Sequence, residues 1–258
     1  MRDLDAQLAG RVAIVTGASR GIGKGLALGL ARAGCRVVCA ARTLDPDPAG
    51  LPGSVRETAA AIRAEGGEAL PLQCDIGSAD AIQAMVAATL AEYGRIDVLM
   101  NNAMASTRGL FRDTTAEMWD HSMRVNVRSL FVACQAVWPA MKRQGGGSII
   151  QMSSGAAEHQ TPGMPPGYLV YSVAKAALER FSSALALELA ADNIAVNALR
   201  PGAVKTETSV HELGEDYDWT GWLTPESVVP SVLFLAAQDG SGFTGRIVDA
   251  RFYGERWP

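Results

Sequence analysis

The sequence predicts an α/β fold in which helices cover both faces of a mostly parallel sheet. Short apolar runs rich in β-branched residues recur along the chain, and each has the length of a strand buried on both faces. Helical stretches separate these runs, and such alternation joins parallel strands through right-handed crossovers. The 258 residues contain no internal repeat and no linker, so we expect one domain over residues 1–258.

The first predicted strand, residues 11–15, runs directly into a glycine-rich segment and a helix over residues 22–33. Residues 45–53 follow the second strand as a surface loop, because their three prolines forbid both helix and central strand. The other predicted strands are residues 36–41, 68–74, 96–101, 148–152, 194–199 and 246–248.

The glycine-rich segment, residues 16–23, reads Thr-Gly-Ala-Ser-Arg-Gly-Ile-Gly. Gly17 permits a tight turn, Gly21 lets a pyrophosphate approach the backbone, and Gly23 allows close packing of helix and strand. The N-terminus of the following helix faces the anion. Many tight turns use glycine, but the position between a buried strand and a helix predicts a dinucleotide-binding loop.

Cofactor choice depends on the end of the second strand, where a carboxylate would accept hydrogen bonds from the adenosine ribose. The chain instead reads Ala40-Ala41-Arg42, and no acid occurs before Asp45. Arg42 and Arg20 could pair with a 2′-phosphate through bidentate guanidinium contacts. We therefore expect NADP(H) rather than NAD(H). The alternative is that both arginines are solvated surface charges.

An acid–base pair is predicted at Tyr171 and Lys175, which lie four residues apart and so share one face of a helix. A free phenol has a pKa of about 10 and is a poor base at neutral pH. A neighbouring ammonium group favours the phenolate. Taken alone, the pair could equally be an ordinary exposed helix pair.

Five further motifs occur in order along the chain: Cys74-Asp75-Ile76, Asn101-Asn102-Ala103, Val125-Asn126-Val127, residues 148–154 and residues 196–202. Together with the glycine segment and the Tyr171–Lys175 pair, they resemble the short-chain dehydrogenase/reductase family over residues 10–247. The resemblance implies a doubly wound Rossmann-type fold. It also implies reversible hydride transfer between a nicotinamide and a ketone or secondary alcohol.

The resemblance assigns catalytic roles to four residues. Tyr171 would be the general acid in reduction and the base in oxidation, and Lys175 would lower its pKa and bind the nicotinamide ribose. Ser154 would hydrogen-bond the substrate carbonyl, and Asn126 would hold a water that links Lys175 to solvent. Counting along the motif from Gly147 selects Ser154 over its neighbour. Without the resemblance, these polar residues could be satisfied locally at a strand end and in a helix.

The same resemblance predicts a dinucleotide-contacting set. Asp75 and Ile76 would flank the adenine, and Thr206 would approach the nicotinamide amide or the pyrophosphate. The full set is Gly17, Ser19, Arg20, Gly21, Ile22, Gly23, Arg42, Asp75, Ile76, Asn102, Ala103, Tyr171, Lys175, Pro201, Gly202, Val204 and Thr206.

Substrate selectivity is expected in residues 207–223, which the family uses as a mobile flap over the substrate. Two departures from the family pattern lie nearby: Met104 stands where glycine is common, and an insertion within residues 158–167 lengthens the path to Tyr171. Met104 could alter a turn or reach the pocket. The predicted substrate residues, Met104, Met164, Tyr168, Trp219 and Trp222, favour an apolar or cyclic substrate. Alternatively, the tryptophans only pack the flap onto the body.

Composition excludes several partners. A net charge of −4, a pI near 5.5 and the lack of a basic run argue against nucleic acid and anionic membranes. The N-terminal residues do not resemble a signal peptide, and no apolar segment is long enough to span a bilayer, so we expect a cytoplasmic protein. The four cysteines suit buried thiols, and the three histidines lack metal-ligand spacing, so no metal is predicted.

Two classes of function remain. The presence of Asn126, Ser154, Tyr171 and Lys175 together favours a carbonyl reductase or alcohol dehydrogenase. The alternative is a catalytically silent dinucleotide-binding regulator of the same fold. The resemblance also implies a homotetramer or homodimer formed through the long helices predicted at residues 115–142 and 171–191.

Overall fold

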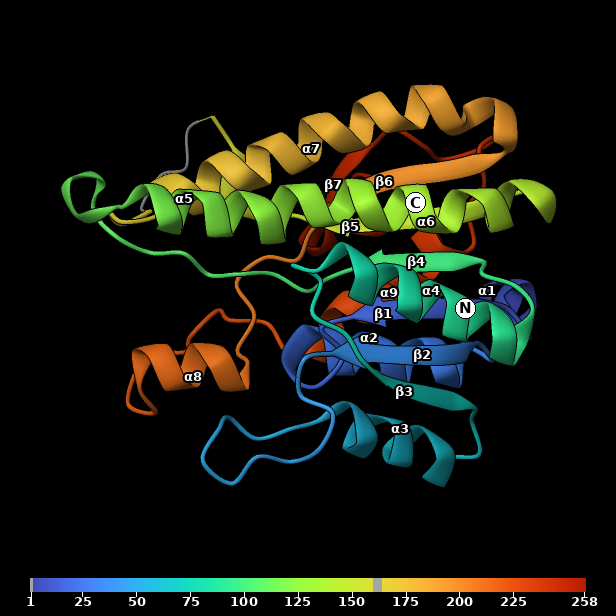
Figure 1. Ribbon diagram of the computed structural model, residues 1–258, viewed down its shortest axis with the longest axis horizontal. Helices are drawn as coiled ribbons and strands as arrows, with labels where there is room; N and C mark the ends of the chain where they lie inside the picture. Colours follow the sequence, from blue (N-terminus) through green and yellow to red (C-terminus); the bar gives the residue numbers. More distant parts are fainter. Residues whose placement is uncertain (1, 160–163) are drawn as a thin grey trace.

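The computed structural model describes residues 2–159 and 164–258, and its centre is a seven-stranded parallel sheet (Figure 1). The strand order is β3-β2-β1-β4-β5-β6-β7. The predicted fold class is confirmed, and each predicted strand forms. The strands are β1 Val12–Thr16, β2 Arg36–Ala41, β3 Ala69–Gln73, β4 Val98–Asn101, β5 Gly147–Met152, β6 Ile194–Arg200 and β7 Ile247–Asp249.

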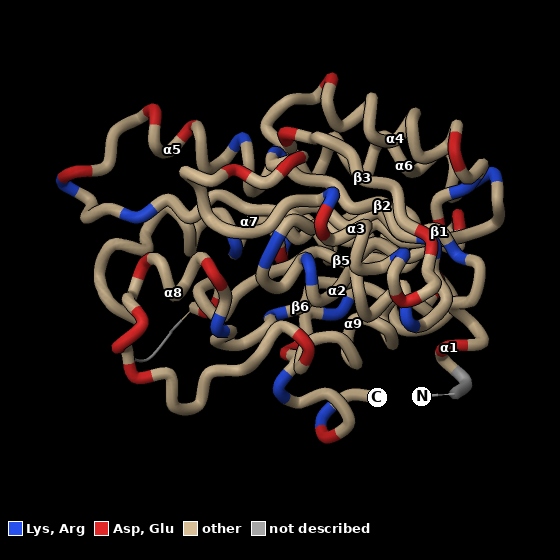
Figure 2. The backbone as a smooth tube through the Cα atoms, turned by 90° about the horizontal axis from the view of Figure 1, so that it is seen from below, with Lys and Arg blue, Asp and Glu red and all other residues tan. Residues whose placement is uncertain are grey.

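Helices cover both faces of the sheet. One apolar core lies between the sheet and α2, α3 and α9, and the other lies between the sheet and α4, α6 and α7. The helices are α1 Arg2–Leu8, α2 Gly21–Arg32, α3 Val55–Ala64, α4 Ala79–Tyr93, α5 Ala116–Met123, α6 Ser129–Arg143, α7 Leu169–Leu189, α8 Glu207–Leu213 and α9 Val229–Ala236. Figure 1 shows α8 set apart from the sheet, and Figure 2 shows basic and acidic residues intermingled along the backbone.

The sheet order reverses between β1 and β4, since the chain runs outward from β1 to β3 and then returns to start β4 beside β1. In open parallel sheets, ligands bind outside the carboxyl ends of the strands at such a reversal. Thr16 ends β1 there and Asn101 ends β4 there. The fold therefore places the predicted dinucleotide loop at the expected edge.

The glycine loop closes on a neighbouring turn with no room for side chains. A Cβ atom on Gly23 would lie 2.1 Å from the Gly17 carbonyl oxygen, and one on Gly17 would lie 2.8 Å from Nδ2 of Asn102. Gly17 also has a positive φ of 70°. The close packing predicted for Gly23 and the tight turn predicted for Gly17 are both observed.

The long helix predicted over residues 115–142 is divided into three parts. Residues Arg124–Arg128 form a π-helical turn between α5 and α6. Asn126 lies in this turn, and its side chain binds the main chain of Ala105, in the segment after β4. One extra residue in the turn lets Asn126 face that segment, so the interruption has a local hydrogen-bonding cause.

All four cysteines are buried and free. Burial raises the pKa of Cys35, Cys39 and Cys134 to about 12 and that of Cys74 to about 11. These thiols stay protonated at neutral pH and pack as small apolar groups, as predicted.

Candidate active site

The candidate active site lies at the carboxyl ends of β1, β4, β5 and β6, with α7 along one side (Figure 1). Tyr171 and Lys175 come from consecutive turns of α7, and Ser154 follows the end of β5. Packing between α7 and β6, and between α7 and the short turn Gly155–Ala157, holds these elements together.

Lys175 is the most buried charged group of the site, with a relative exposure of 3%. Its Nζ atom donates a hydrogen bond of 2.6 Å to the Met152 carbonyl at the end of β5. The same atom lies 5.6 Å from the ring centre of Tyr171. The ammonium group therefore sits under the tyrosine and against the strand end.

Burial shifts the pKa values of Tyr171 and Lys175 in opposite directions. Burial lowers the pKa of Lys175 to about 8, and the negative charge of Glu179 opposes that change. Burial raises the pKa of Tyr171, while the Ser154 hydroxyl acts to lower it. We expected Lys175 to lower the tyrosine pKa. The net shift of the Tyr171 pKa is upward, because burial outweighs the groups that lower it, and the effect of Lys175 itself stays a prediction.

The adjacent serines face opposite ways, as expected at a strand end. Ser153 is buried and donates a 2.6 Å hydrogen bond to Oε1 of Glu179. Ser154 is half-buried, and its Oγ accepts a hydrogen bond from the Ala156 amide. Of the two serines, Ser154 is the one whose hydroxyl acts on Tyr171, in line with the predicted choice.

Asn126 makes a closed set of hydrogen bonds. Its Nδ2 donates to the Ala105 carbonyl and to Oγ of Ser122, and its Oδ1 accepts from the Ala105 amide. These bonds clamp the segment after β4 beside α7. Because the side-chain amide of Asn126 binds protein groups through both its oxygen and its nitrogen, it holds that segment in place.

Thr16 links the glycine loop to the end of β4. Its Oγ1 accepts hydrogen bonds from the amides of Asn102 and Ala103, at 3.0 and 3.1 Å. Asn102 in turn donates from Nδ2 to the Thr16 carbonyl at 2.9 Å. Sequence reasoning named Asn102 and Ala103 but missed Thr16, although it begins the glycine motif.

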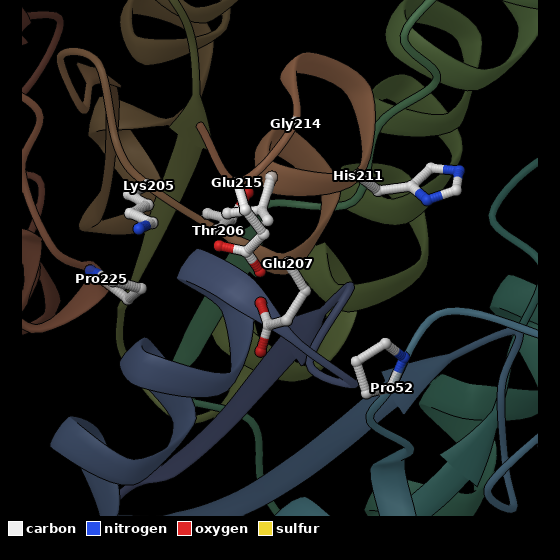
Figure 3. Close-up of a pocket in the computed structure, with 9 residues that line it drawn as sticks. Pro52, Lys205, Thr206, Glu207, His211, Gly214, Glu215 and Pro225 are labelled. Carbon is white, nitrogen blue, oxygen red and sulfur yellow. The ribbon is translucent and has the colours of Figure 1, made fainter. Parts of the chain in front are cut away.

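A carboxylate occupies the helix N-terminus where a pyrophosphate is predicted. Oε2 of Glu207 accepts a 2.8 Å hydrogen bond from the Gly21 amide, at the start of α2. Figure 3 shows the Glu207 side chain pointing at this helix. An anion on these amides is the arrangement that a pyrophosphate needs, so the glycine loop fits a dinucleotide.

A cavity of about 760 Å³ opens beside this contact, between Pro52 of the long loop, Thr206, and the flap residues Glu207 and His211 (Figure 3). Among the described residues, none of the predicted catalytic side chains lines it. Thr206 also lies against the glycine loop, since a Cβ on Gly21 would be 3.2 Å from its side chain. The cavity therefore belongs to the dinucleotide side of the site.

The two arginines predicted to read a 2′-phosphate differ in the structure. Arg20 donates hydrogen bonds to the carbonyls of Leu51, Pro52 and Gly53, which ties the long loop to the glycine loop. Arg42 is exposed and lines a second hollow of about 550 Å³ at the end of β2. Within the described chain its side chain makes no hydrogen bond or ion pair. Arg42 is thus the better placed of the two for an exposed phosphate.

The remaining predicted dinucleotide residues line the same edge. Asp75 is exposed and Ile76 half-buried after β3, and Ser19 and Ile22 lie in the glycine loop. Thr206 caps α8 through a reciprocal pair of bonds with Ser209. The segment after β6 contains buried Pro201, Gly202 with a φ of 80°, and Val204, which pairs with Leu223.

Three of the five predicted substrate residues lie at the catalytic helix. The Tyr171 hydroxyl is 3.5 Å from Sδ of Met104, so Met104 reaches the site. Met164 Sδ lies 3.8 Å from the Ser172 hydroxyl, and the Tyr168 ring packs edge-on to Tyr171 at 6.3 Å. Of the insertion, residues 160–163 lie outside the described residues.

Trp219 and Trp222 are placed differently. They pack edge-on against each other at 5.0 Å, and both pack on Tyr217. Lys205 covers the ring of Trp219 at 4.8 Å. The tryptophans thus form a cluster within the flap, and a contact with substrate stays a prediction.

An unpredicted ion pair joins the flap to the site entrance. Nη2 of Arg108 lies 2.8 Å from Oε2 of Glu212 in α8, and the Arg108 guanidinium stacks over the Tyr168 ring at 4.7 Å. Neither residue belongs to a recognisable motif, so no sequence signal could have paired them.

Two searches of the described residues gave negative results. In residues 2–159 and 164–258, no group of three or more His, Cys, Asp or Glu side chains could hold a metal ion. In the same part of the chain, no helix has the length and apolar character needed to cross a bilayer.

The sheet order, the glycine loop and the Tyr171–Lys175 pair define a nucleotide-dependent oxidoreductase of the doubly wound α/β class. Comparison with known proteins narrows the class. The family model described as short chain dehydrogenase matches residues 11–216. The chain belongs to the short-chain dehydrogenase/reductase family, whose members bind NAD(P).

Individual relatives agree with this assignment. Dehydrogenase/reductase SDR family member 4 of Oryctolagus cuniculus is 36% identical over 252 residues, covering 93% of this chain and 92% of that protein. A short-chain type dehydrogenase/reductase from Mycobacterium marinum superposes with a TM-score of 0.83 at 33% identity, over 96% of each chain. A putative NAD(P) dependent gluconate 5-dehydrogenase from Beutenbergia cavernae, with NADP bound at low occupancy, gives a TM-score of 0.82 at 31% identity, covering 94% of this chain and 96% of that one.

Proposed function

We propose that this protein is an NADP(H)-dependent oxidoreductase that interconverts ketones and secondary alcohols with an apolar or cyclic body. The observation that carries the proposal is the convergence of Tyr171, Ser154 and Lys175 beside the glycine loop. The Lys175 ammonium lies under the Tyr171 ring, and a hydrogen bond with the Ser154 hydroxyl lowers the pKa of the phenol. These are the groups that proton exchange with a carbonyl oxygen requires.

In carbonyl reduction, the glycine loop would hold the dinucleotide, whose nicotinamide would supply the hydride for the new carbon–hydrogen bond. Tyr171 donates its phenolic proton to the carbonyl oxygen, which becomes the alcohol hydroxyl. Ser154 donates a hydrogen bond to the same oxygen and holds it at the phenol. Lys175 stabilises the phenolate until a solvent proton restores it, and oxidation reverses each transfer.

Support for NADP(H) comes from the end of β2. No carboxylate occupies the last positions of this strand, and the exposed guanidinium of Arg42 borders the hollow beside it. A 2′-phosphate there would gain a charge-assisted contact. The related Beutenbergia cavernae structure carries NADP. Arg20 contributes by fixing the loop that borders the hollow.

Support for an apolar or cyclic substrate comes from Met104, Met164 and Tyr168, which surround the catalytic face of α7. Methionine side chains adapt to irregular apolar ligands. We also retain two sequence predictions as part of the proposal: a homodimer or homotetramer, and a cytoplasmic location.

The test follows oxidation of NADPH and NADH with aliphatic, aryl and cyclic ketones, for the native protein and for Tyr171→Phe. We expect NADPH turnover that falls at least about a hundredfold in the variant, since general acid catalysis contributes roughly 10²–10⁴-fold. Tyr93→Phe, on α4 away from the site, is the matched control. Dinucleotide binding, followed by fluorescence, should be retained in both variants.

Three results would count against parts of the proposal. Equal rates for the native protein and Tyr171→Phe would remove the tyrosine from the chemistry. Dinucleotide binding without turnover of any ketone or alcohol would favour the silent regulator. A clear preference for NADH would overturn the role given to Arg42.

A further inference from the structure

A buried cluster of polar and charged groups lies one helical turn beyond Lys175. Glu179, on α7, has a relative exposure of 6%. Its Oε1 accepts hydrogen bonds from Ser153 Oγ at 2.6 Å and Arg200 Nε at 2.7 Å, and its Oε2 accepts from Arg200 Nη2 at 2.8 Å. A carboxylate this deeply buried needs such partners, because an unpaired buried charge is costly.

We propose that Glu179 is a positioning residue of the active site, which fixes the ends of β5 and β6 against α7 and places a negative charge one helical turn beyond Lys175. This inference rests on the proposed function, in which Ser154 and Lys175 take part. Glu179 itself does not contact the predicted substrate position and acts through its neighbours.

The first step is the register between α7 and β5. Lys175 binds the carbonyl of Met152, and Glu179, one turn later, binds the side chain of Ser153. Two consecutive turns of the helix thus hold two consecutive residues of the strand end. The next residue is Ser154, so its placement relative to Tyr171 is set by these two bonds.

The second step concerns β6. Arg200 is the last residue of this strand. Its guanidinium donates two parallel hydrogen bonds to the Glu179 carboxylate, which is a strong geometry for such a pair. Its Nη1 donates to Glu158, which follows the short turn after Ser154. The chain continues from Arg200 through Pro201 toward the flap. One carboxylate therefore ties the catalytic strand end to the start of the flap segment.

The third step is electrostatic. Tyr171 and Glu179 flank Lys175 on the preceding and following turns of α7; Arg200 on β6 pairs with Glu179, and Glu158 pairs with Arg200. Their charges alternate along the cluster. Burial lowers the pKa of Lys175 to about 8, and Glu179 acts in the opposite direction. Loss of the Glu179 charge would bring deprotonation of Lys175 closer to neutral pH.

The experiment uses Glu179→Gln, which keeps an acceptor for Ser153 but removes the charge. The chain has only four lysines, so protein grown with ¹³Cε-lysine gives a simple NMR spectrum, and Lys175→Arg identifies the signal of interest. We expect its titration midpoint to fall by about one pH unit or more in Glu179→Gln. Glu188→Gln, an exposed change on the same helix, should leave the midpoint unchanged.

Ser153→Ala separates the positioning effect from the charge effect. It removes one bond of the cluster and leaves the Glu179–Arg200 pair intact, so we expect kcat to fall about three- to tenfold with an unchanged lysine midpoint. The alkaline limb of the kcat profile should move to lower pH in Glu179→Gln and stay in place in Ser153→Ala. Thermal unfolding of each variant shows whether the fold is retained.

An unchanged Lys175 midpoint in folded Glu179→Gln, or an unchanged kcat in Ser153→Ala, would overturn the corresponding half of the inference. If Glu179→Gln does not fold, Ser153→Ala still tests the positioning half. The lysine titration is read without dinucleotide or substrate, so it tests Glu179 even if no ketone is turned over.

Discussion

The base of the active site and its flap side are held by different kinds of contact. At the base, Lys175 and Glu179 are only 3% and 6% exposed, and their hydrogen bonds run to strand ends of the sheet. On the flap side, residues 211–218 are all exposed, and the side-chain contacts to the body include the Arg108–Glu212 ion pair and the hydrogen bond of Glu207 with the Gly21 amide. Water and salt compete with the second kind of contact far more than with the first.

This difference suggests that the base and the flap have separate roles in the site. Buried bonds at the base fix the geometry that proton transfer needs, whatever the substrate. Exposed contacts on the flap can be exchanged at little cost when a dinucleotide or substrate enters. Substitutions should therefore affect the chemistry and stability at the base, and mainly affinity at the flap.

The largest expected effect is that of Lys175→Met. Removing the ammonium should lower kcat by about a thousandfold, since the phenolate at Tyr171 loses its counter-charge. The same change should raise thermal stability at pH 7. Burial lowers the pKa of Lys175 from 10.5 to about 8, so the folded protein bears a cost for keeping it charged, on the order of 1–3 kcal/mol.

The sign of the pH dependence follows from the same pKa. Between pH 8 and about 10.4 the unfolded lysine holds its proton and the folded one loses it, so native stability rises with pH across this window. The stability gain of Lys175→Met should thus be full at pH 7 and shrink toward pH 10. If Lys175→Met unfolds at a lower temperature than the native protein at pH 7, the buried ammonium group stabilises this part of the site, and the predicted cost of burying it would be refuted.

A smaller effect is expected for Glu207→Gln, on the flap side. Its carboxylate binds the Gly21 amide that a pyrophosphate would use. Neutral glutamine competes less well at a helix N-terminus, so dinucleotide affinity should increase about three- to tenfold. Isothermal titration with NADP⁺ measures the change. Glu215→Gln, which lines the same cavity, is the control, and unchanged or weaker binding in Glu207→Gln would contradict the competition.

The two regions also differ in how well the sequence predicted them. At the base, strand–helix alternation and fixed motif spacings predicted that Tyr171, Lys175 and Ser154 lie close together, and the structure brings them together, while their catalytic roles stay predictions. The net upward shift of the Tyr171 pKa could not be predicted from the sequence, since it comes from burial of the phenol in the folded chain. Glu179 carried a readable signal, an acid one turn after Lys175, but its partner Arg200 comes from another strand.

On the flap side, the sequence predicted fewer of the contacts that the structure contains, for a different physical reason. The sequence left open whether Trp219 and Trp222 contact substrate or only pack the flap onto the body, and in the structure their rings pack against each other, since aromatic rings bury area well in this way. The contact of Glu207 with Gly21 joins residues that are 186 positions apart. Such contacts depend on how a short exposed helix docks, which no local pattern encodes.

The smallest expected effect concerns the Arg108–Glu212 pair. Arg108→Gln removes the ion pair to the flap and the stacking over Tyr168. Exposed pairs contribute roughly 0.2–1 kcal/mol, so we expect KM to change about two- to fivefold with kcat nearly constant. The difference from the native protein should vanish near 0.5 M salt, because screening weakens the pair in the native protein as well. Arg112→Gln, whose exposed pair with Asp113 stays within one turn, is the control. A large loss of kcat in Arg108→Gln would mean that the flap takes part in the chemistry, and the division between base and flap would have to be abandoned.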